Sequence, residues 1–166
     1  MSSLSPWEWI GAPFLLCVVW TILFAIPLRV FGLQLPEPVF ALWPVFAWAM
    51  IRPSILAPLA VLALGYFLDI FWGGPQGLWA LSLLIAYGTV LAARSLMIGQ
   101  GAAAMFAWFL VVAALALGAA TMITIVKVAA APNPVALAWQ FVATIVLYPF
   151  SQRLIDRFED ADVRFR

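Results

Sequence analysis

The chain contains 166 residues, of which 67% are hydrophobic and only 9% are charged, whereas a soluble domain is about one quarter charged. This composition leaves too little polar surface to cover a water-soluble fold, so lipid is the expected solvent. The net charge of +1 excludes a strongly basic nucleic-acid-binding surface, and the absence of histidine removes the commonest general base and transition-metal ligand.

The apolar runs predict α-helices rather than a β-barrel. Only helices and closed barrels pair every backbone N–H and C=O group in hydrocarbon, and a barrel strand alternates apolar and polar residues. Runs such as 57–70 and 102–126 show no such alternation. We therefore predict an all-α polytopic membrane protein, a compact bundle of six transmembrane helices. In chain order, the predicted helices cover residues 9–28, 38–51, 54–72, 78–93, 102–126 and 134–150.

The second predicted helix is the shortest. It opens at Glu37 and Pro38, where a proline costs little because the first N–H groups of a helix lack partners anyway. Fewer residues separate Pro38 from Arg52 than the roughly 20 that a span requires. The segment is therefore expected to be tilted, re-entrant or buried among its neighbours. If it is re-entrant, five helices cross and the termini lie on opposite sides.

The sixth predicted helix has the clearest start signal. Asn133 is a favourable N-cap residue, and Pro134 suits the first helical position.

The basic residues predict the orientation. With six spans and the N-terminus inside, two basic residues, Arg29 and Lys127, are external and six are cytoplasmic, as the positive-inside rule favours. The six are Arg52, Arg94, Arg153, Arg157, Arg164 and Arg166. Four of them belong to the end of the chain, so we predict one transmembrane domain over 1–150 and a charged cytoplasmic tail over 151–166.

Asp69 is the most unusual ionisable residue, because it lies near the end of an apolar segment. A charge at the middle of a bilayer costs about 2.5–3.5 kcal/mol, and much less near the interface. In one interpretation the carboxylate binds a cation, a substrate or a partner helix. In the other, which we favour, it accepts hydrogen bonds from N–H groups of the turn 73–77 and of the start of the next helix.

A glycine-rich turn follows Asp69. The turn contains Gly73, Gly74, Pro75 and Gly77, and its glycines permit positive φ angles and a close approach of the two flanking helices. The turn lacks the lysine and the hydroxyl residue of a phosphate-binding P-loop, so we do not expect it to bind phosphate.

Ala114 and Gly118 form a small-xxx-small pair in the fifth predicted helix. Small residues let helices approach closely in lipid, where no hydrophobic drive brings them together. We expect this pair to pack inside the bundle in preference to contacting a second protein.

The tail carries apolar residues at helical spacing: Leu154, Phe158, Ala161 and Phe165. Such a helix could dock a cytoplasmic partner or lie on the lipid surface, or it could simply extend the sixth helix. Acidic residues between the apolar ones argue against anionic lipid as its target.

The residue inventory does not favour an enzyme. A serine–histidine protease and a His-Glu-x-x-His metalloprotease both require histidine, which the chain lacks. We expect no catalytic residues, no cofactor and no metal.

Residues 65–81 carry a motif with the sequence Gly-Tyr-Phe-Leu-Asp-Ile-Phe-Trp-Gly-Gly-Pro-Gln-Gly-Leu-Trp-Ala-Leu. It resembles the signature of the MreD family, the rod shape-determining membrane proteins of bacteria: an apolar Gly-Leu-Leu-Leu-Asp run, a Gly-Pro-x-Gly turn and Leu-x-Ala-Leu. The chain length and the six-segment plan fit as well. The chain departs from the pattern at Trp79, where many relatives carry histidine, and at Phe71 and Trp72, where smaller polar residues are common.

The resemblance implies a nonenzymatic scaffold of the cell-elongation complex in the bacterial inner membrane, with both termini cytoplasmic. Proteins of this family associate with the bitopic protein MreC, and through it with MreB filaments and the RodA–penicillin-binding protein synthase of peptidoglycan. The competing hypothesis is a substrate-binding subunit of an energy-coupling-factor-type transporter for small solutes. In that case Asp69, Trp72 and Gln76 would line an outward pocket.

Overall fold

The computed structural model describes residues 7–25, 29–30, 33–34, 37–51 and 54–163, and for residues 8, 29–30, 33–34 and 158–163 it describes the backbone alone. Within these ranges the chain is all-α apart from one short antiparallel hairpin, in which Arg29 pairs with Gln34 and Val30 with Leu33. The elements are a π-helical turn at Trp7–Gly11, α1 (Ala12–Phe24), β1 (Arg29–Val30), β2 (Leu33–Gln34), α2 (Leu42–Ile51), α3 (Leu56–Phe71), α4 (Leu78–Met97), α5 (Ala102–Val128), α6 (Pro134–Ile145) and α7 (Tyr148–Val163).

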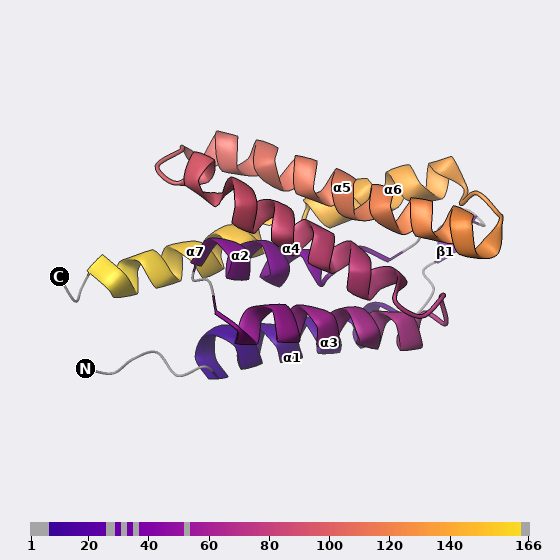
Figure 1. Ribbon diagram of the computed structural model, residues 1–166, viewed down its shortest axis with the longest axis horizontal. Helices are drawn as coiled ribbons and strands as arrows, with labels where there is room; N and C mark the ends of the chain where they lie inside the picture. Colours follow the sequence, from indigo (N-terminus) through magenta and orange to yellow (C-terminus); the bar gives the residue numbers. More distant parts are fainter. Residues whose placement is uncertain (1–6, 26–28, 31–32, 35–36, 52–53, 164–166) are drawn as a thin grey trace.

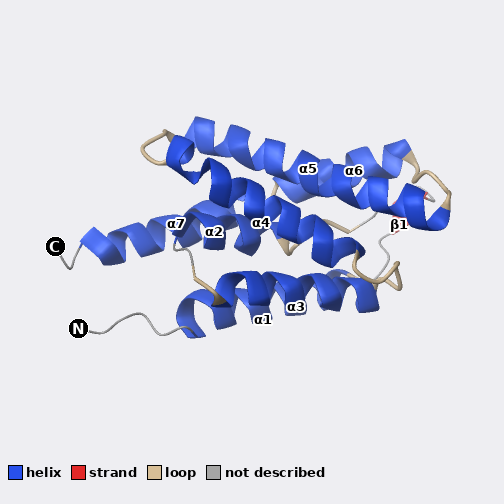
Figure 2. Cartoon of the chain, viewed as in Figure 1, coloured by secondary structure: helices blue, strands red, loops and turns tan. Residues whose placement is uncertain are grey.

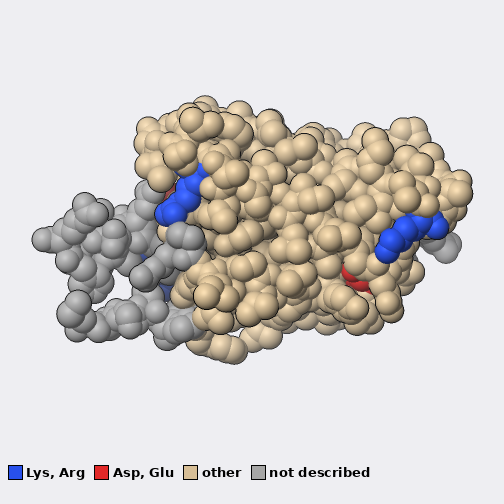
Figure 3. Space-filling model, viewed as in Figure 1, with Lys and Arg blue, Asp and Glu red and all other residues tan. Residues whose placement is uncertain are grey.

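Three helical stretches in the described part of the chain are long and apolar enough to cross a bilayer: Leu78–Met97, Ala102–Val128 and Pro134–Arg157. The last combines α6 with the beginning of α7. Three shorter helices are also apolar, at Trp9–Phe24, Leu42–Ile51 and Leu56–Phe71. Charged side chains lie toward the two ends of the visible face, with a broad uncharged band between them (Figure 3). These features indicate a multi-pass membrane protein.

The helices lie along one long axis; α3, α4, α5 and α6 alternate in direction, and α7 continues in the direction of α6 (Figures 1 and 2). Successive helices α3, α4 and α5 pack as antiparallel neighbours, and α2 contacts both α4 and α7. The π-helical turn before α1 and the C-terminal part of α7 lie at the same end of the bundle (Figure 1).

Helix α2 lies at the centre of the bundle, and every residue from Val39 to Met50 is buried. Its aromatic side chains are held on more than one side. Phe46 meets Phe109 of α5 edge to face, with ring centroids 5.3 Å apart, and the Trp48 indole N–H donates to the backbone oxygen of Trp9 at 2.7 Å. Of the arrangements expected for this segment, burial among its neighbours is therefore confirmed.

The second segment is only partly helical, so the prediction of a helix from Pro38 is wrong. Helix α2 starts at Leu42 and places Pro44 in its first turn. Pro44 has no N–H to donate to the carbonyl of Phe40, and its ring obstructs a helix at that point, so the helix cannot continue toward Pro38. The chain before α2 is consequently non-helical.

The whole segment nevertheless runs from one end of the bundle to the other. Near its start, the Glu37 carboxylate accepts a bond from the Trp72 indole, just before α4 begins. At its end, the carbonyl of Ile51 accepts a bond from Arg94, close to where α4 finishes. Ten helical residues cover about 15 Å, and the preceding non-helical residues extend by up to about 3.3 Å each. A mixed segment can thus match the roughly 30 Å of a hydrocarbon core with 15 residues.

Helices α3 and α4 approach each other closely at Gly65. A Cβ atom added there would collide with the backbone of Ala80. Because glycine has no side chain, the two backbones can touch at this position, as expected for helices that pack in lipid. This contact fixes the crossing point one turn before Asp69.

Near the C-terminus the described residues continue as one helix across residue 150. Helix α7 extends on both sides of that position, and Ser151 and Ile155 are buried against the core. The start of α6 agrees with the sequence: the Asn133 side chain accepts a bond from the N–H of Val135 at 2.9 Å, and Pro134 opens the helix.

Candidate functional site at the corner between helices α3 and α4

The motif at residues 65–81 folds into one corner, in which Asp69 of α3 closes the turn into α4. Asp69 is only 2% exposed. Its Oδ2 accepts a bond from the N–H of Gly77 at 2.8 Å, and its Oδ1 accepts from the N–H of Trp79 at 2.7 Å. Both N–H groups lie at the N-terminal cap or in the first turn of α4, where backbone N–H groups have no partner inside the helix. The capping interpretation of Asp69 is confirmed.

The turn itself takes the conformation that its glycines allow. Gly73 has φ 63° and Gly77 has φ 85°, in the left-handed region that other residues seldom adopt. Added Cβ atoms at Gly73, Gly74 and Gly77 would meet nothing within 4 Å. The predicted positive φ angles are confirmed, but the close helix approach expected here lies at Gly65 instead.

Two further bonds attach this corner to distant parts of the chain. The Trp72 indole N–H donates to Oε2 of Glu37 at 3.1 Å, and Lys127 at the end of α5 donates to the backbone oxygen of Gln76 at 2.7 Å. The rings of Trp72 and Trp79 also meet edge to face at 5.0 Å. The corner is thus fastened to the second segment and to α5.

A second polar arrangement, missed by the sequence analysis, lies on one face of α6 and α7. We call it the polar stripe: Gln140, Thr144 and Ser151. The Gln140 amide donates to the backbone oxygen of Glu37 at 3.1 Å. Ser151 donates to the carbonyl of Trp43 at 3.0 Å.

Thr144 holds the middle of the polar stripe. Its hydroxyl accepts a bond from the N–H of Val39 at 3.0 Å and donates to its own helix at the carbonyl of Gln140 at 2.7 Å. Non-helical backbone at membrane depth is tolerated where protein groups satisfy it. The polar stripe therefore supplies partners to the non-helical stretch before α2. Its signal in the sequence is three polar residues at i, i+4 and i+11 in an apolar helix.

The small pair Ala114 and Gly118 faces outward, so the expectation that it packs inside the bundle is wrong. Both residues are exposed, and an added Cβ at Gly118 would meet nothing within 4 Å. The inner face of α5 instead carries Ala113, Ala116 and Ala120. Because both faces of this helix are apolar and rich in small residues, spacing alone does not tell them apart.

The apolar residues of the tail divide between the bundle and the undescribed side chains. Leu154 is half-buried and packs against the core, beside buried Ile155. Phe158 and Ala161 lie in α7, but their side chains, like the whole of Phe165, fall outside the described residues.

The described residues contain no group of three or more histidine, cysteine, aspartate or glutamate side chains that could hold a metal ion. Asp69 uses both of its oxygens within the protein, so the chemistry of this corner is structural. Comparison with models of protein families, with curated proteins and with solved structures gave no match.

Proposed function

We propose that the chain is a nonenzymatic membrane scaffold of the bacterial cell-elongation complex, similar to MreD proteins, with a role in cell shape and peptidoglycan synthesis. The observation that carries the proposal is the motif at residues 65–81, together with its fold. Its carboxylate is consumed by two backbone N–H groups, its glycines set the turn and the helix crossing, and its tryptophan binds Glu37. A motif whose polar groups bind one another fits a chain that acts through its surfaces.

We place the chain in the bacterial inner membrane with six crossings and both termini in the cytoplasm. Support comes from the second segment, which runs the length of the bundle. It also comes from the start of the first described helix and the finish of α7, which lie at the same end of the bundle. Arg94, Arg153 and Arg157 lie toward that end, whereas Lys127 lies at the other. This distribution follows the positive-inside rule.

The partner in this proposal is MreC, through which MreB and the RodA–penicillin-binding protein synthase are reached. A bitopic partner presents a single transmembrane helix, and such a helix packs best against small residues. The outward pair Ala114 and Gly118 offers that surface on α5. We therefore assign the partner contact to this face.

A matched pair of glycine substitutions tests the assignment. Gly118→Leu places a bulky side chain on the proposed contact surface of α5. Gly88→Leu places the same side chain at an exposed position of α4, outside that surface. Neither added side chain meets the bundle at its Cβ, and leucine favours a helix more than glycine does. We expect Gly118→Leu to lower the recovery of MreC with the tagged chain from native membranes at least several-fold, and Gly88→Leu to leave it unchanged.

Two results would count against the proposal. Recovery of the wild-type chain from mild detergent without any wall-synthesis partner would contradict the scaffold function itself. Equal recovery of MreC with both variants would contradict only the contact on α5.

The transporter hypothesis requires Asp69 to line an outward pocket. The two oxygens of that carboxylate bind Gly77 and Trp79, and the side chain is 2% exposed. The geometry therefore supports the scaffold better. Binding of a small solute by the purified protein would reverse this preference.

A further inference from the structure

Helix α3 offers only a short apolar surface to lipid. The most exposed side chains near its two ends are Ile55, which is 84% exposed, and Ile70, which is 71% exposed. They are 15 residues apart in the sequence, so a rise of 1.5 Å per residue separates them by about 23 Å along the helix axis. The hydrocarbon core of a bilayer is about 30 Å thick, so this surface is about 7 Å too short. Any tilt of the helix makes its projection shorter still.

Polar groups limit the apolar surface at the end of α3 that carries the motif. Within the described part of the chain, an added Cβ atom at Gly73 or Gly74 would meet nothing within 4 Å, so the protein leaves the turn uncovered there. Lys127 donates to the backbone oxygen of Gln76 in the same turn at 2.7 Å. Lipid-exposed turns do not occur within hydrocarbon. Water must therefore reach the level of this turn.

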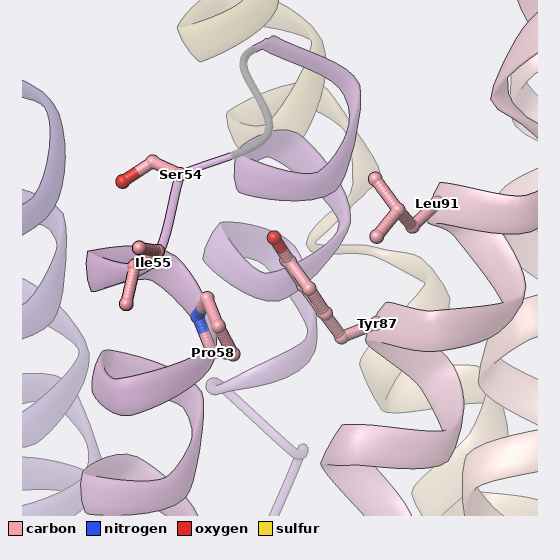
Figure 4. Close-up of a pocket in the computed structure, with 5 residues that line it drawn as sticks. All are labelled: Ser54, Ile55, Pro58, Tyr87 and Leu91. Carbon is pink, nitrogen blue, oxygen red and sulfur yellow. The ribbon is translucent and has the colours of Figure 1, made fainter.

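Polar groups also limit the surface at the start of α3. The N–H of Leu56 donates to the Ser54 hydroxyl at 3.1 Å, and Arg94 of α4 donates to the carbonyl of Ile51 at 3.1 Å. A shallow depression separates this end of α3 from α4 (Figure 4). Along α4, the 17 residues from Gly77 to Arg94 cover about 26 Å. Both helices therefore indicate an apolar layer thinner than an ordinary hydrocarbon core.

Helix α5, which packs on the other side of α4, is much longer and extends beyond α3 (Figure 1). Its exposed apolar positions run from Ala103 to Val126, about 35 Å apart. A long helix fits a bilayer by tilting, whereas a short one thins the bilayer, extends flanking side chains toward the interface or associates with another chain. Gly73 and Gly74 have no side chains to extend. The apolar belt of the molecule is therefore thinnest at α3.

We propose that the exposed face of α3 binds short acyl chains and thins the bilayer beside it by about 7 Å. This face consists of Ile55, Leu59, Leu62, Tyr66 and Ile70. Longer chains would place the uncovered turn in hydrocarbon, so the length of the face selects the lipid. The position of Tyr66, about one turn inside Ile70, agrees with a lowered interface, because tyrosine favours the headgroup level. The inference is independent of the proposed scaffold function.

Spin labels at the two ends of α3 measure the local thickness. Ile55→Cys and Ile70→Cys are labelled in separate preparations of the full chain and reconstituted into vesicles of dioleoyl phosphatidylcholine and phosphatidylglycerol. Power saturation of the electron paramagnetic resonance signal, with oxygen and a water-soluble nickel complex, gives the depth of each label. We expect both labels at the hydrocarbon boundary, whereas in an unthinned bilayer each would lie about 4 Å inside it.

Three controls accompany this pair. Wild-type protein should take up no label, because its single cysteine, Cys17, is fully buried. A label on Leu62→Cys, at the middle of the same face, should lie deep in the hydrocarbon. Val111→Cys and Val126→Cys repeat the 15-residue spacing at exposed positions of α5. On this longer surface the label at Val111 should stay inside the hydrocarbon.

Several results would overturn the proposal. Labels about 4 Å inside the hydrocarbon at both ends of α3 would show that the bilayer is not thinned. One label at the boundary and the other deep would show that the helix is displaced along the membrane normal instead. Shielding of both labels from oxygen and from nickel would show that protein, such as a second copy of the chain, covers this face. A boundary position for both α5 labels would show that thinning is not specific to α3.

Discussion

Removal of the Asp69 side chain should open the corner between α3 and α4. In Asp69→Ala the N–H groups of Gly77 and Trp79 lose their acceptors at 2.8 and 2.7 Å, in a place where the replaced residue is 2% exposed. A hydrogen bond to a charged group contributes about 1.5–3 kcal/mol in soluble proteins. Polar contacts measured inside membranes contribute less, about 0.6 kcal/mol on average. Two lost bonds should therefore lower the free energy of unfolding by about 2–4 kcal/mol.

Asp69→Asn refines this estimate because the two bonds use different oxygens. One amide oxygen can replace only one of them, and the amide nitrogen would then face an N–H donor. We expect a loss of about 1–2 kcal/mol, between that of the wild type and that of the alanine variant.

Unfolding by sodium dodecyl sulfate in mixed micelles measures these differences. Gln76→Ala is the control, since the Gln76 side chain is exposed on the same turn and only its backbone oxygen binds Lys127. If both Asp69 variants unfold within about 0.5 kcal/mol of the wild type, the range typical of surface substitutions, the conclusion that Asp69 holds this corner is refuted.

Two other substitutions test how the helices pack. Thr144→Val keeps the shape of the side chain but leaves the N–H of Val39 without an acceptor, so the free energy of unfolding should fall by about 1–3 kcal/mol in the same assay. Gly65→Ala forces a methyl group into the backbone of Ala80; the expected loss is about 1–3 kcal/mol, with a lower yield of folded protein in size-exclusion chromatography.

Each of these has a matched control on α5. Thr124→Val removes a hydroxyl that binds only the carbonyl of Ala120 in its own helix, so it should be nearly neutral. Gly118→Ala adds a methyl group where nothing lies within 4 Å and should be neutral or slightly stabilising. A control that costs as much as its test variant would show that the named contact is not the cause.

Hydropathy and local signals predicted the parts of this fold that depend on neighbouring residues. The apolar segments, the Asn133 cap and the capping role of Asp69 all follow from groups within about ten residues of one another. Such arrangements depend on the helix-end N–H groups that have no intrahelical partner and are capped by nearby side chains. The chain before α2 was mispredicted because the effect of Pro44 on Phe40 outweighed the favourable position of Pro38.

Features that depend on distant residues could not be predicted in this way. The bond from Val39 to Thr144 joins positions 105 residues apart, and the burial of α2 depends on where its neighbours lie. The orientation of Ala114 and Gly118 was mispredicted for a related reason. In a soluble protein the polar face of a helix marks its outside, but in lipid both faces are apolar, so composition does not identify the inward one.

The hydrogen bonds of the polar stripe can form only after the last helices of the chain have been synthesised. Glu37, Val39 and Trp43 leave the ribosome more than 100 residues before the side chains that complete their hydrogen bonding. Because synthesis adds about 5–20 residues per second, the partner side chains are made roughly 5–20 s after the early segment. During that interval its carbonyl and amide groups lack hydrogen-bond partners and are costly to bury in hydrocarbon. The insertion machinery or interfacial water must therefore bind them. Folding of the bundle is therefore completed only when its last helix is in place.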